Sequence, residues 1–313
     1  MRRLTFLFVP LCLFFFNALA TLTFAQSVRV PGTNVTLVPP DGFSPAREYP
    51  GFERPEVRAS IMVTELPVPA SDMIRSMTVP ALATKGMTLI SASDVTINDR
   101  PARLLNVRQK TTAGEFLKWM LIAGDVKTTF MLVGMFDESL AAGAGDAIKR
   151  SLLTTTWGTA GRSGPFEGLP FRVTPTARLK LANRVSNMLM FTESGTSGKP
   201  GSTEALFLAG HSIGKGRIED VQSFAETRAT QTTLTKNVAN FRGRHVQVAG
   251  LDGYELEADA TDARSGRSMR LYQVILLDGT GYFILQGLCL ADQATEVVPE
   301  FKALTGSFRM VAR

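Results

Sequence analysis

The string with the clearest catalytic pattern is Gly210-His-Ser-Ile-Gly214, which fits G-x-S-x-G. In serine hydrolases this string forms a tight turn between a strand and a helix, and the turn presents the serine hydroxyl to a histidine base. Ser212 would be the nucleophile, and His245 is the only histidine that follows it. Their separation of 33 residues is too short for the remaining strands of a hydrolase sheet. The pattern therefore favours a glycine-rich loop after a strand, and a hydrolase is our third hypothesis.

Three carboxylates alternate along one expected strand, at Glu255, Glu257 and Asp259. Alternate side chains project from the same face of a strand, so the three could attract a hard cation such as calcium. The same alternation is typical of a strand with one face in solvent. Two histidines and one cysteine after residue 25 are too few for a typical zinc site. From the sequence we assign no catalytic, cofactor-binding or metal-binding residue, and we expect no cofactor.

Methionines at positions 62, 73, 77 and 87 could line an adaptable apolar pocket. They also suit an ordinary core, because methionine fills irregular gaps. Cys289 lies between two leucines and is predicted to be a small buried hydrophobe without a disulfide partner. The methionines supply our second hypothesis, a carrier of a small apolar or lipidic ligand.

The N-terminus has the pattern of an export signal. Met1-Arg-Arg3 is followed by the apolar run Leu4–Phe16 and by the small-residue exit Thr23-Phe-Ala25. This order predicts a signal peptide over residues 1–25, with an uncleaved membrane anchor as the alternative. No later segment is apolar and long enough to cross a bilayer, so no stable membrane span is expected after cleavage. We expect a periplasmic or secreted protein.

The charge of the chain is mildly basic and evenly spread. There are 34 basic and 28 acidic residues, which gives a net charge of +6, with no run of Lys or Arg. A nucleic-acid-binding surface requires clustered basic residues, so that class of partner is excluded. Hydrophobic residues make up 44% of the sequence, as in ordinary globular domains.

An internal repeat organises the rest of the chain. The segment Lys118–Gly134 reads as two apolar strands around a polar turn, and Tyr272–Gly287 repeats it 153 positions later. The matched pairs are Ile122 with Ile275, Asp125 with Asp278, Phe130 with Phe283, Leu132 with Leu285 and Gly134 with Gly287. A period this long indicates two copies of one domain, because solenoid units are shorter.

The repeat predicts a first domain over 27–157, a linker over 158–168 and a second domain over 169–313. Each copy reads as hairpin, strand, helix, four strands and helix. Local strand pairing with few helices predicts an α+β fold in which helices cover an antiparallel sheet, an α/β/α sandwich. In the second copy we expect a short strand at His245–Val248. We also expect a helix over Asp292–Leu304, with Pro299 as an alternative start.

Three features carry a family resemblance: Pro39-Pro-Asp-Gly-Phe43, the hairpin that contains Lys118-Trp119, and the closing helix that ends in Ser151-Leu-Leu-Thr-Thr-Thr-Trp157. With these features, the order of elements resembles the PsbP-like superfamily, which includes a photosystem II extrinsic protein, a Ran-binding import factor and many exported bacterial proteins. The second copy lacks a clear Pro-Pro-x-Gly-Phe string. The family is mostly non-catalytic, so the resemblance implies a fold and a tendency to bind partners, and it transfers no functional residue.

Our leading hypothesis is an exported, non-catalytic binding or accessory protein with two tandem interaction domains and a protein partner. It rests on the duplication, the signal segment and the shortage of catalytic residue types. The alternative is the carrier of a small apolar or lipidic ligand, and the third is a serine hydrolase that uses Ser212. The sequence leaves open the identity of the partner, the oligomeric state, the rigidity of the two-domain arrangement and the choice between periplasm and extracellular space.

Overall fold

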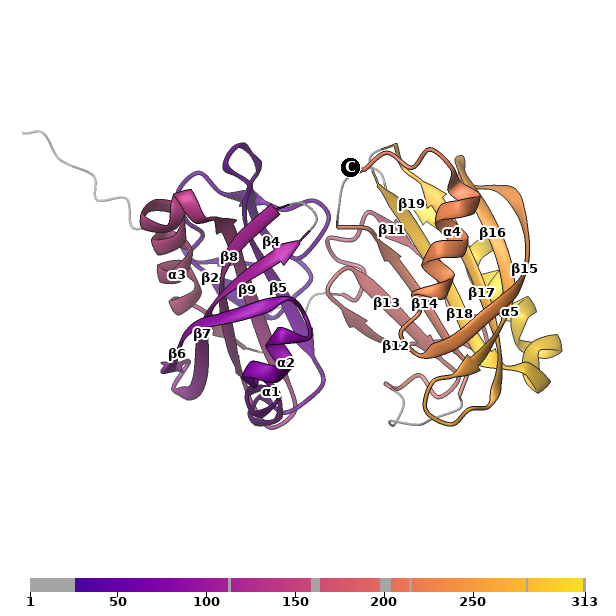
Figure 1. Ribbon diagram of the computed structural model, residues 1–313, viewed down its shortest axis with the longest axis horizontal. Coiled ribbons are helices and arrows are strands. Elements are labelled where there is room, and N and C mark those ends of the chain that lie inside the picture. Colours follow the sequence, from indigo (N-terminus) through magenta and orange to yellow (C-terminus); the bar gives the residue numbers. More distant parts are fainter. Residues whose placement is uncertain are drawn as a thin grey trace, which may run out of the picture.

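The computed structural model describes residues 26–111, 114–158, 164–197, 204–213, 216–279 and 281–311. The predicted signal segment lies outside these residues and stays a prediction. Within them the chain builds two large antiparallel sheets, one from each half of the sequence, which lie next to each other (Figure 1). None of the helices in the described ranges has the length and apolarity needed to cross a membrane.

The first sheet has seven strands in the order β3-β4-β5-β9-β8-β7-β6, and all neighbours are antiparallel. Its strands are β3 (Ser44–Pro45), β4 (Gly51–Arg54), β5 (Ala59–Leu66), β6 (Met87–Ile97), β7 (Arg100–Thr111), β8 (Gly114–Gly124) and β9 (Thr129–Asp137). A small additional sheet joins β1 (Val28–Arg29), β2 (Val35–Leu37) and β10 (Thr156–Trp157).

The second sheet repeats this order as β12-β13-β14-β18-β17-β16-β15. Its strands are β12 (Lys180–Val185), β13 (Met188–Thr192), β14 (Leu206–His211), β15 (Thr235–Val248), β16 (Leu251–Asp262), β17 (Ser268–Leu277) and β18 (Tyr282–Leu290). The short strands β11 (Phe171–Arg172) and β19 (Arg309–Met310) pair beside it. We call the halves that contain the two sheets the first and the second unit.

Helices lie against both faces of each sheet but cover only part of them. In the first unit, α1 (Ala70–Ser76) and α2 (Val79–Ala83) pack over Met120 and Ile122. The opposite face packs against α3 (Asp146–Leu153), which follows short 3₁₀ and π turns over residues 138–145. The edge strand β6 stays largely exposed. The predicted antiparallel sheets are confirmed, whereas a complete helical cover is not seen.

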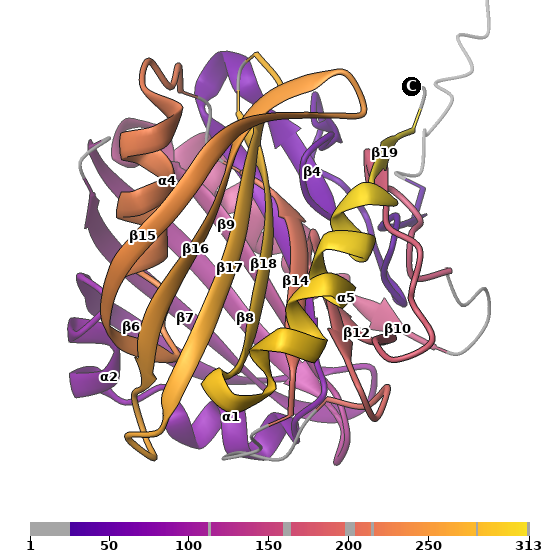
Figure 2. The same ribbon diagram turned by 90° about the vertical axis from the view of Figure 1, so that its right-hand side faces the viewer.

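The second unit follows the same plan. The helix α4 (Val221–Thr230) packs on the face that carries Leu271 and Ile275, and α5 (Ala294–Gly306) packs on the face that carries Tyr272 and Val274. Figure 2 looks onto this sheet, with α5 across it and β15 along one edge. Pro299 lies inside α5, so the alternative helix start at that proline is wrong.

The structure places the repeat in one register. In the first sheet Ile122 pairs with Met131, and in the second Ile275 pairs with Ile284, which is the same pairing shifted by 153 residues. The shift extends to the closing helices. A Cβ on Gly134 would lie 2.1 Å from Cγ2 of Ile148, and a Cβ on Gly287 would lie 2.4 Å from Cδ2 of Phe301. Both glycines therefore let a helix side chain approach the sheet backbone.

One strand is longer than the sequence indicates. We expected a strand only at His245–Val248, but β15 begins at Thr235. Its residues are exposed or half-buried on both faces, so the strand lacks the alternation of apolar and polar residues by which strands are identified in sequence.

Candidate functional site

The structure does not bring the predicted hydrolase residues together. Ser212 follows β14, and its Oγ accepts a hydrogen bond from the backbone N of Tyr282 at 3.0 Å. His245 lies on β15, four strand positions away across the same sheet. Neighbouring strands are about 4.8 Å apart, which places the two strands about 19 Å from each other. The Ser212–His245 pair therefore cannot form a catalytic hydrogen bond in this fold.

A different histidine lies next to Ser212, and no sequence pattern pointed to its partner. His211 Nε2 lies 2.5 Å from Asp278 Oδ2, and the His211 side chain is only 2% exposed. Within the described residues, His211 Nδ1 is buried without a hydrogen-bond partner. Consecutive side chains of an extended strand point to opposite faces, so the His211–Asp278 pair faces away from the Ser212 hydroxyl. The pair buries two polar groups together and is not a Ser–His–Asp relay.

The three alternating carboxylates are each held by a cation of the chain. Arg244 Nε lies 2.8 Å from Glu255, Lys302 Nζ lies 2.8 Å from Glu257, and Arg270 Nη1 lies 3.2 Å from Asp259. Among the residues that the structure describes, no group of three or more acidic, histidine or cysteine side chains could hold a metal ion. The carboxylates are therefore engaged in ion pairs with cations of the second unit.

Most of the methionines lie in the core. Met73, Met77 and Met87 pack against the apolar cluster beneath α1 and α2, and Met62 lies outside that cluster. The cavities described below are not lined by these three side chains. Cys289 is buried, as expected, and burial raises the pKa of its thiol to about 12, so it stays protonated at neutral pH.

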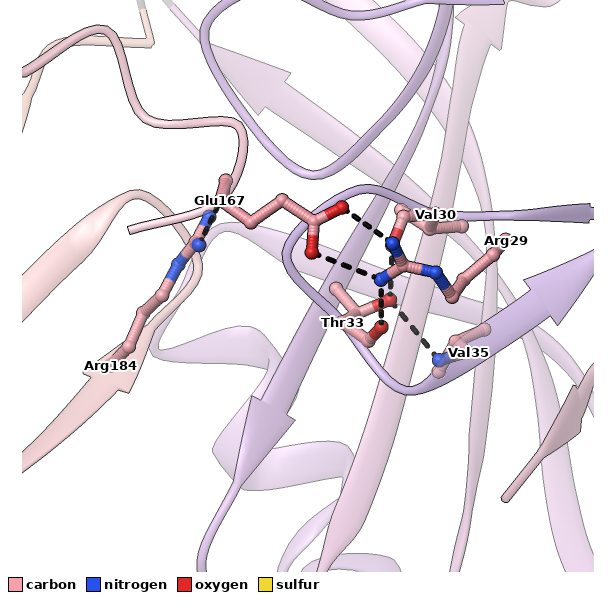
Figure 3. Close-up of polar contacts among 6 residues, drawn as sticks. All are labelled: Arg29, Val30, Thr33, Val35, Glu167 and Arg184. Carbon is pink, nitrogen blue, oxygen red and sulfur yellow. Dashed lines mark hydrogen bonds and ion pairs between the residues drawn. The ribbon is translucent and has the colours of Figure 1, made fainter. Parts of the chain in front are cut away.

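The residues that join the two units come from three separate parts of the chain. Glu167, in the connection between the units, accepts two hydrogen bonds from the Arg29 guanidinium, at 2.5 and 3.2 Å (Figure 3). Beside it, Thr33 Oγ1 donates to the carbonyl of Val30 and accepts from the backbone N of Val35, which fixes the turn after β1. Arg29 and Glu167 are each about one-third exposed, so this ion pair alone contributes modestly to holding the units together.

Arg184 of β12 completes the junction from the second unit. Its Nη1 donates to the carbonyls of Pro165 at 3.2 Å and Glu167 at 2.5 Å, and its Nε donates to the carbonyl of Ser186 at 2.7 Å. The guanidinium lies against Gly32 of the first unit, where φ is +77° and a Cβ would come within 2.5 Å of Arg184 Nη2. The positive φ angle favours a glycine at position 32, and a side chain there would also displace the Arg184 guanidinium.

A cavity of about 270 Å³ lies at this junction. Its walls come from both units and from the connection between them, and they include Asn34, Glu65, Pro165, Ala182, Arg184 and Ser186. Asn34 donates to Glu65 through its backbone N and, at 3.1 Å, through Nδ2. Among the described residues that line the cavity, Glu65 and Arg184 are the charged ones. Such an arrangement can bind a charged or polar molecule, and the described lining contains no nucleophile with an adjacent base.

A second, shallower cavity of about 690 Å³ lies at the start of α4. Phe224 and Tyr282, whose rings meet edge to face at 4.9 Å, form one wall, and Glu219 and Asp220 lie at its rim. Asp220 caps the helix by accepting from the backbone N of Ser223. Its carboxylate therefore stabilises the start of α4.

No family model and no curated protein matches this chain. Several solved structures are similar to it in part. Cyanobacterial PsbP (CyanoP) from Synechocystis sp. is 12% identical, over 46% of this chain and 99% of that one, with a TM-score of 0.32. LpqN, involved in cell envelope biogenesis of Mycobacterium tuberculosis, is 14% identical, over 45% and 83%, with a TM-score of 0.31.

A third similar structure covers most of both chains. The immunity protein TplEi of the T6SS from Pseudomonas aeruginosa is 10% identical, over 91% of this chain and 96% of that one, with a TM-score of 0.34. All three TM-scores are too low to carry an argument about fold or function.

Proposed function

We propose that this chain is an exported, non-catalytic binding protein that docks an extended segment of a partner protein along β6. The observation that carries the proposal is the difference between the edge strands β6 and β15, which occupy equivalent places at one end of each sheet. We call these two edges the outer edges. We further propose that the units are tandem PsbP-like domains over 27–157 and 169–313, joined by the linker 158–168. The sequence repeat and the equal strand orders support this division. The predicted export signal supports a periplasmic or secreted location.

The outer edge of the second sheet carries features that discourage pairing with another chain. β15 contains Lys236, Arg242 and Arg244, and its pairing with β16 is interrupted by two register shifts. Asn237 and Asn240 have positive φ angles of 54° and 56°, which bend the strand locally. Lysine side chains and bulges are the devices by which proteins protect exposed edge strands.

The outer edge of the first sheet has few such features. β6 runs for 11 residues, contains one charged residue and no proline or glycine, and shows a single register shift. The charged residue, Asp94, is itself paired with Arg103 at 2.6 Å. Within the described strands β6 pairs only with β7, so its other edge presents backbone N–H and C=O groups to solvent. An edge of this kind suits β-strand addition, in which backbone hydrogen bonds provide affinity.

The test adds two lysines to β6 and, as a control, two lysines to β15. The double variant Ser91→Lys, Ser93→Lys places two lysines on exposed positions of β6, and the matched control Ala239→Lys, Gln247→Lys places two on exposed positions of β15. Each protein is used as bait in the exported fraction of its host, and the captured proteins are quantified by mass spectrometry.

We expect at least one protein to be captured by the wild type and by the β15 control and to be lost from the β6 variant. Light scattering of the purified wild type identifies the case in which the occupant is a second copy of the chain. If all three baits capture the same proteins in equal amounts, docking along β6 is wrong.

The hypothesis of an apolar or lipidic carrier gains no support from the junction. The walls of the cavity there mix charged, amide and hydroxyl side chains with apolar ones, whereas apolar ligands are held by mainly apolar walls. Native mass spectrometry of the purified protein tests this alternative, since a co-purified lipid would restore it.

A further inference from the structure

The hairpins at the two outer edges carry opposite net charge. The first, made of β6 and β7 (Met87–Thr111), has a net charge of +2. Its charged residues are Arg100, Arg103, Arg108 and Lys110 against Asp94 and Asp99. The second, made of β15 and β16 (Thr235–Asp262), has three basic and five acidic residues, which gives −2. The edge proposed for docking is therefore the basic one, whereas the protected edge is acidic.

Two cations at the basic edge are available to a ligand. Arg103 and Arg108 form ion pairs with carboxylates of the first unit. Arg100 and Lys85, which lies two residues before β6, are both exposed, and neither forms an ion pair with a described residue. An incoming carboxylate can therefore pair with Lys85 or Arg100 without breaking an existing ion pair.

These two cations lie at opposite ends of β6. Lys85 precedes the first residue of the strand, and Arg100 lies opposite Ile97, its last residue. A strand of 11 residues is about 35 Å long, so an extended segment of similar length beside β6 would reach both cations. Between them Ile90 is 50% exposed and offers a contact to an apolar side chain.

We propose that the segment docked along β6 is acidic at both ends and apolar in its centre, with its carboxylates on Lys85 and Arg100. This inference rests on the docking proposed above and names the chemistry of the partner. Backbone hydrogen bonds to β6 provide the affinity in this arrangement. Charges at the rim of an interface mainly select the partner and speed association.

The test is fluorescence anisotropy of the purified full chain with three labelled peptides of about twelve residues. All share a core of alternating threonine and valine, and they carry two glutamates, two glutamines or two lysines at each end. We expect the glutamate peptide to bind about tenfold more tightly than the lysine peptide, because both ends change from repulsion to attraction. The difference should shrink at high salt. Equal binding of the three peptides, or no binding of the glutamate peptide, would overturn the inference.

A pair of variants assigns the preference to the two cations. Lys85→Glu, Arg100→Glu should reverse the order, so that the lysine peptide binds more tightly than the glutamate peptide. The matched control is Arg47→Glu, Lys127→Glu, which makes the same change of charge in the first unit. Arg47 follows the opposite edge strand β3, and Lys127 lies in the turn between β8 and β9; both are exposed. The control should keep the order of the wild type, and an equal reversal in both variants would contradict the assignment.

A fourth peptide separates this inference from the docking on which it rests. It has the glutamate ends and a proline in the centre, so its charges remain but its pairing with a strand is interrupted. We expect it to bind at least tenfold more weakly than its parent. If proline weakens binding but the three end groups bind equally, docking along β6 is supported and the acidic chemistry is wrong. If proline has no effect, strand addition itself is wrong.

Discussion

The two sheets have the same strand order, but different contacts hold α1 and α2 on the first sheet and α4 on the second. Beneath α1 and α2, the first sheet presents Met120 and Val133, both in an apolar cluster. The positions 153 residues later are Gln273 and Gln286, and both are buried beneath α4. Gln286 Nε2 donates to Gln273 Oε1 at 2.8 Å, and Gln273 Nε2 donates to the carbonyl of Ala225 in the helix at 2.8 Å.

This difference shows which parts of the repeat are fixed by packing alone. Apolar contacts are non-directional, so the first sheet accommodates two short helices separated at the turn before Pro80. A buried amide pair requires specific acceptors, so the second sheet holds one continuous helix at a defined point. On the opposite face both sheets use the same device, a glycine beneath a helix side chain. The shared plan therefore lies on that face, and the two units differ on the other.

The largest effect is expected from Phe301→Ala, which removes the side chain packed on Gly287. Phe301 is fully buried and stacks on Phe207 and Tyr272, so the change should cost about 3–5 kcal/mol of unfolding free energy. Both tryptophans, Trp119 and Trp157, lie in the first unit, so their fluorescence reports on that unit during urea unfolding, while circular dichroism reports on both. Equal shifts by the two probes would show that the units unfold together.

The glycines give the next largest effect. Gly134→Ala and Gly287→Ala should each cost about 1–3 kcal/mol, because the new methyl overlaps Ile148 or Phe301. Gly306→Ala is the control, since a Cβ added there would meet no atom of the described chain within 4 Å beyond its own helix and its neighbours in sequence. The cost of Gly287→Ala should fall when Phe301 is shortened to Leu, and denaturant titration of the double variant checks this. Full additivity would contradict the proposed contact.

A smaller effect is expected from replacing the glutamines with the residues of the first unit. Gln273→Met alone should cost about 1–2 kcal/mol, because Gln286 loses its buried acceptor. Adding Gln286→Val should recover part of this cost, since both polar partners are then absent. Urea unfolding of the two single variants and the double variant forms the cycle. A double variant as unstable as the sum of the singles would show that the amide pair does not act as a unit.

The smallest effect concerns the turn between β8 and β9. Backbone N–H groups of Lys127 and Thr128 donate to Asp125 and lower the pKa of its carboxyl group. A carboxyl whose pKa is lower in the folded state stabilises the fold above its unfolded pKa of about 3.9, and this stabilisation disappears as the pH falls through the folded value. Asp125→Asn should therefore be less stable than the wild type at pH 7, with the difference shrinking below about pH 4. Thermal unfolding across this range measures it, and a constant difference would contradict the assignment.

The sequence predicted the centre of each sheet because apolar alternation and turn residues coincide there. Asp125 accepts backbone hydrogen bonds in its turn, and Asp278 accepts one from Gly281 in the equivalent turn. Because both turns require an aspartate at the same place, the requirement appears in the sequence as a repeated pattern. The first ten residues of β15 left no such pattern, because an edge strand exposed on both faces needs no alternation.

The junction could not be predicted in the same way. Arg29, Glu167 and Arg184 are single residues far apart in the chain, and no spacing rule links them. Their roles follow from how two folded units meet, which is a tertiary property. The sequence offered His245 as the only histidine after Ser212 and favoured a loop over a hydrolase, and it did not indicate that His211 pairs with a carboxylate.

The position of Glu167 has a mechanical consequence. Its side chain is bound to Arg29 and its carbonyl to Arg184, so tension on either unit acts on this one residue. If the two ends of the chain are pulled apart, the two units should separate at the contacts of Glu167 before either sheet unfolds. The long paired strands of each sheet share the load among many hydrogen bonds.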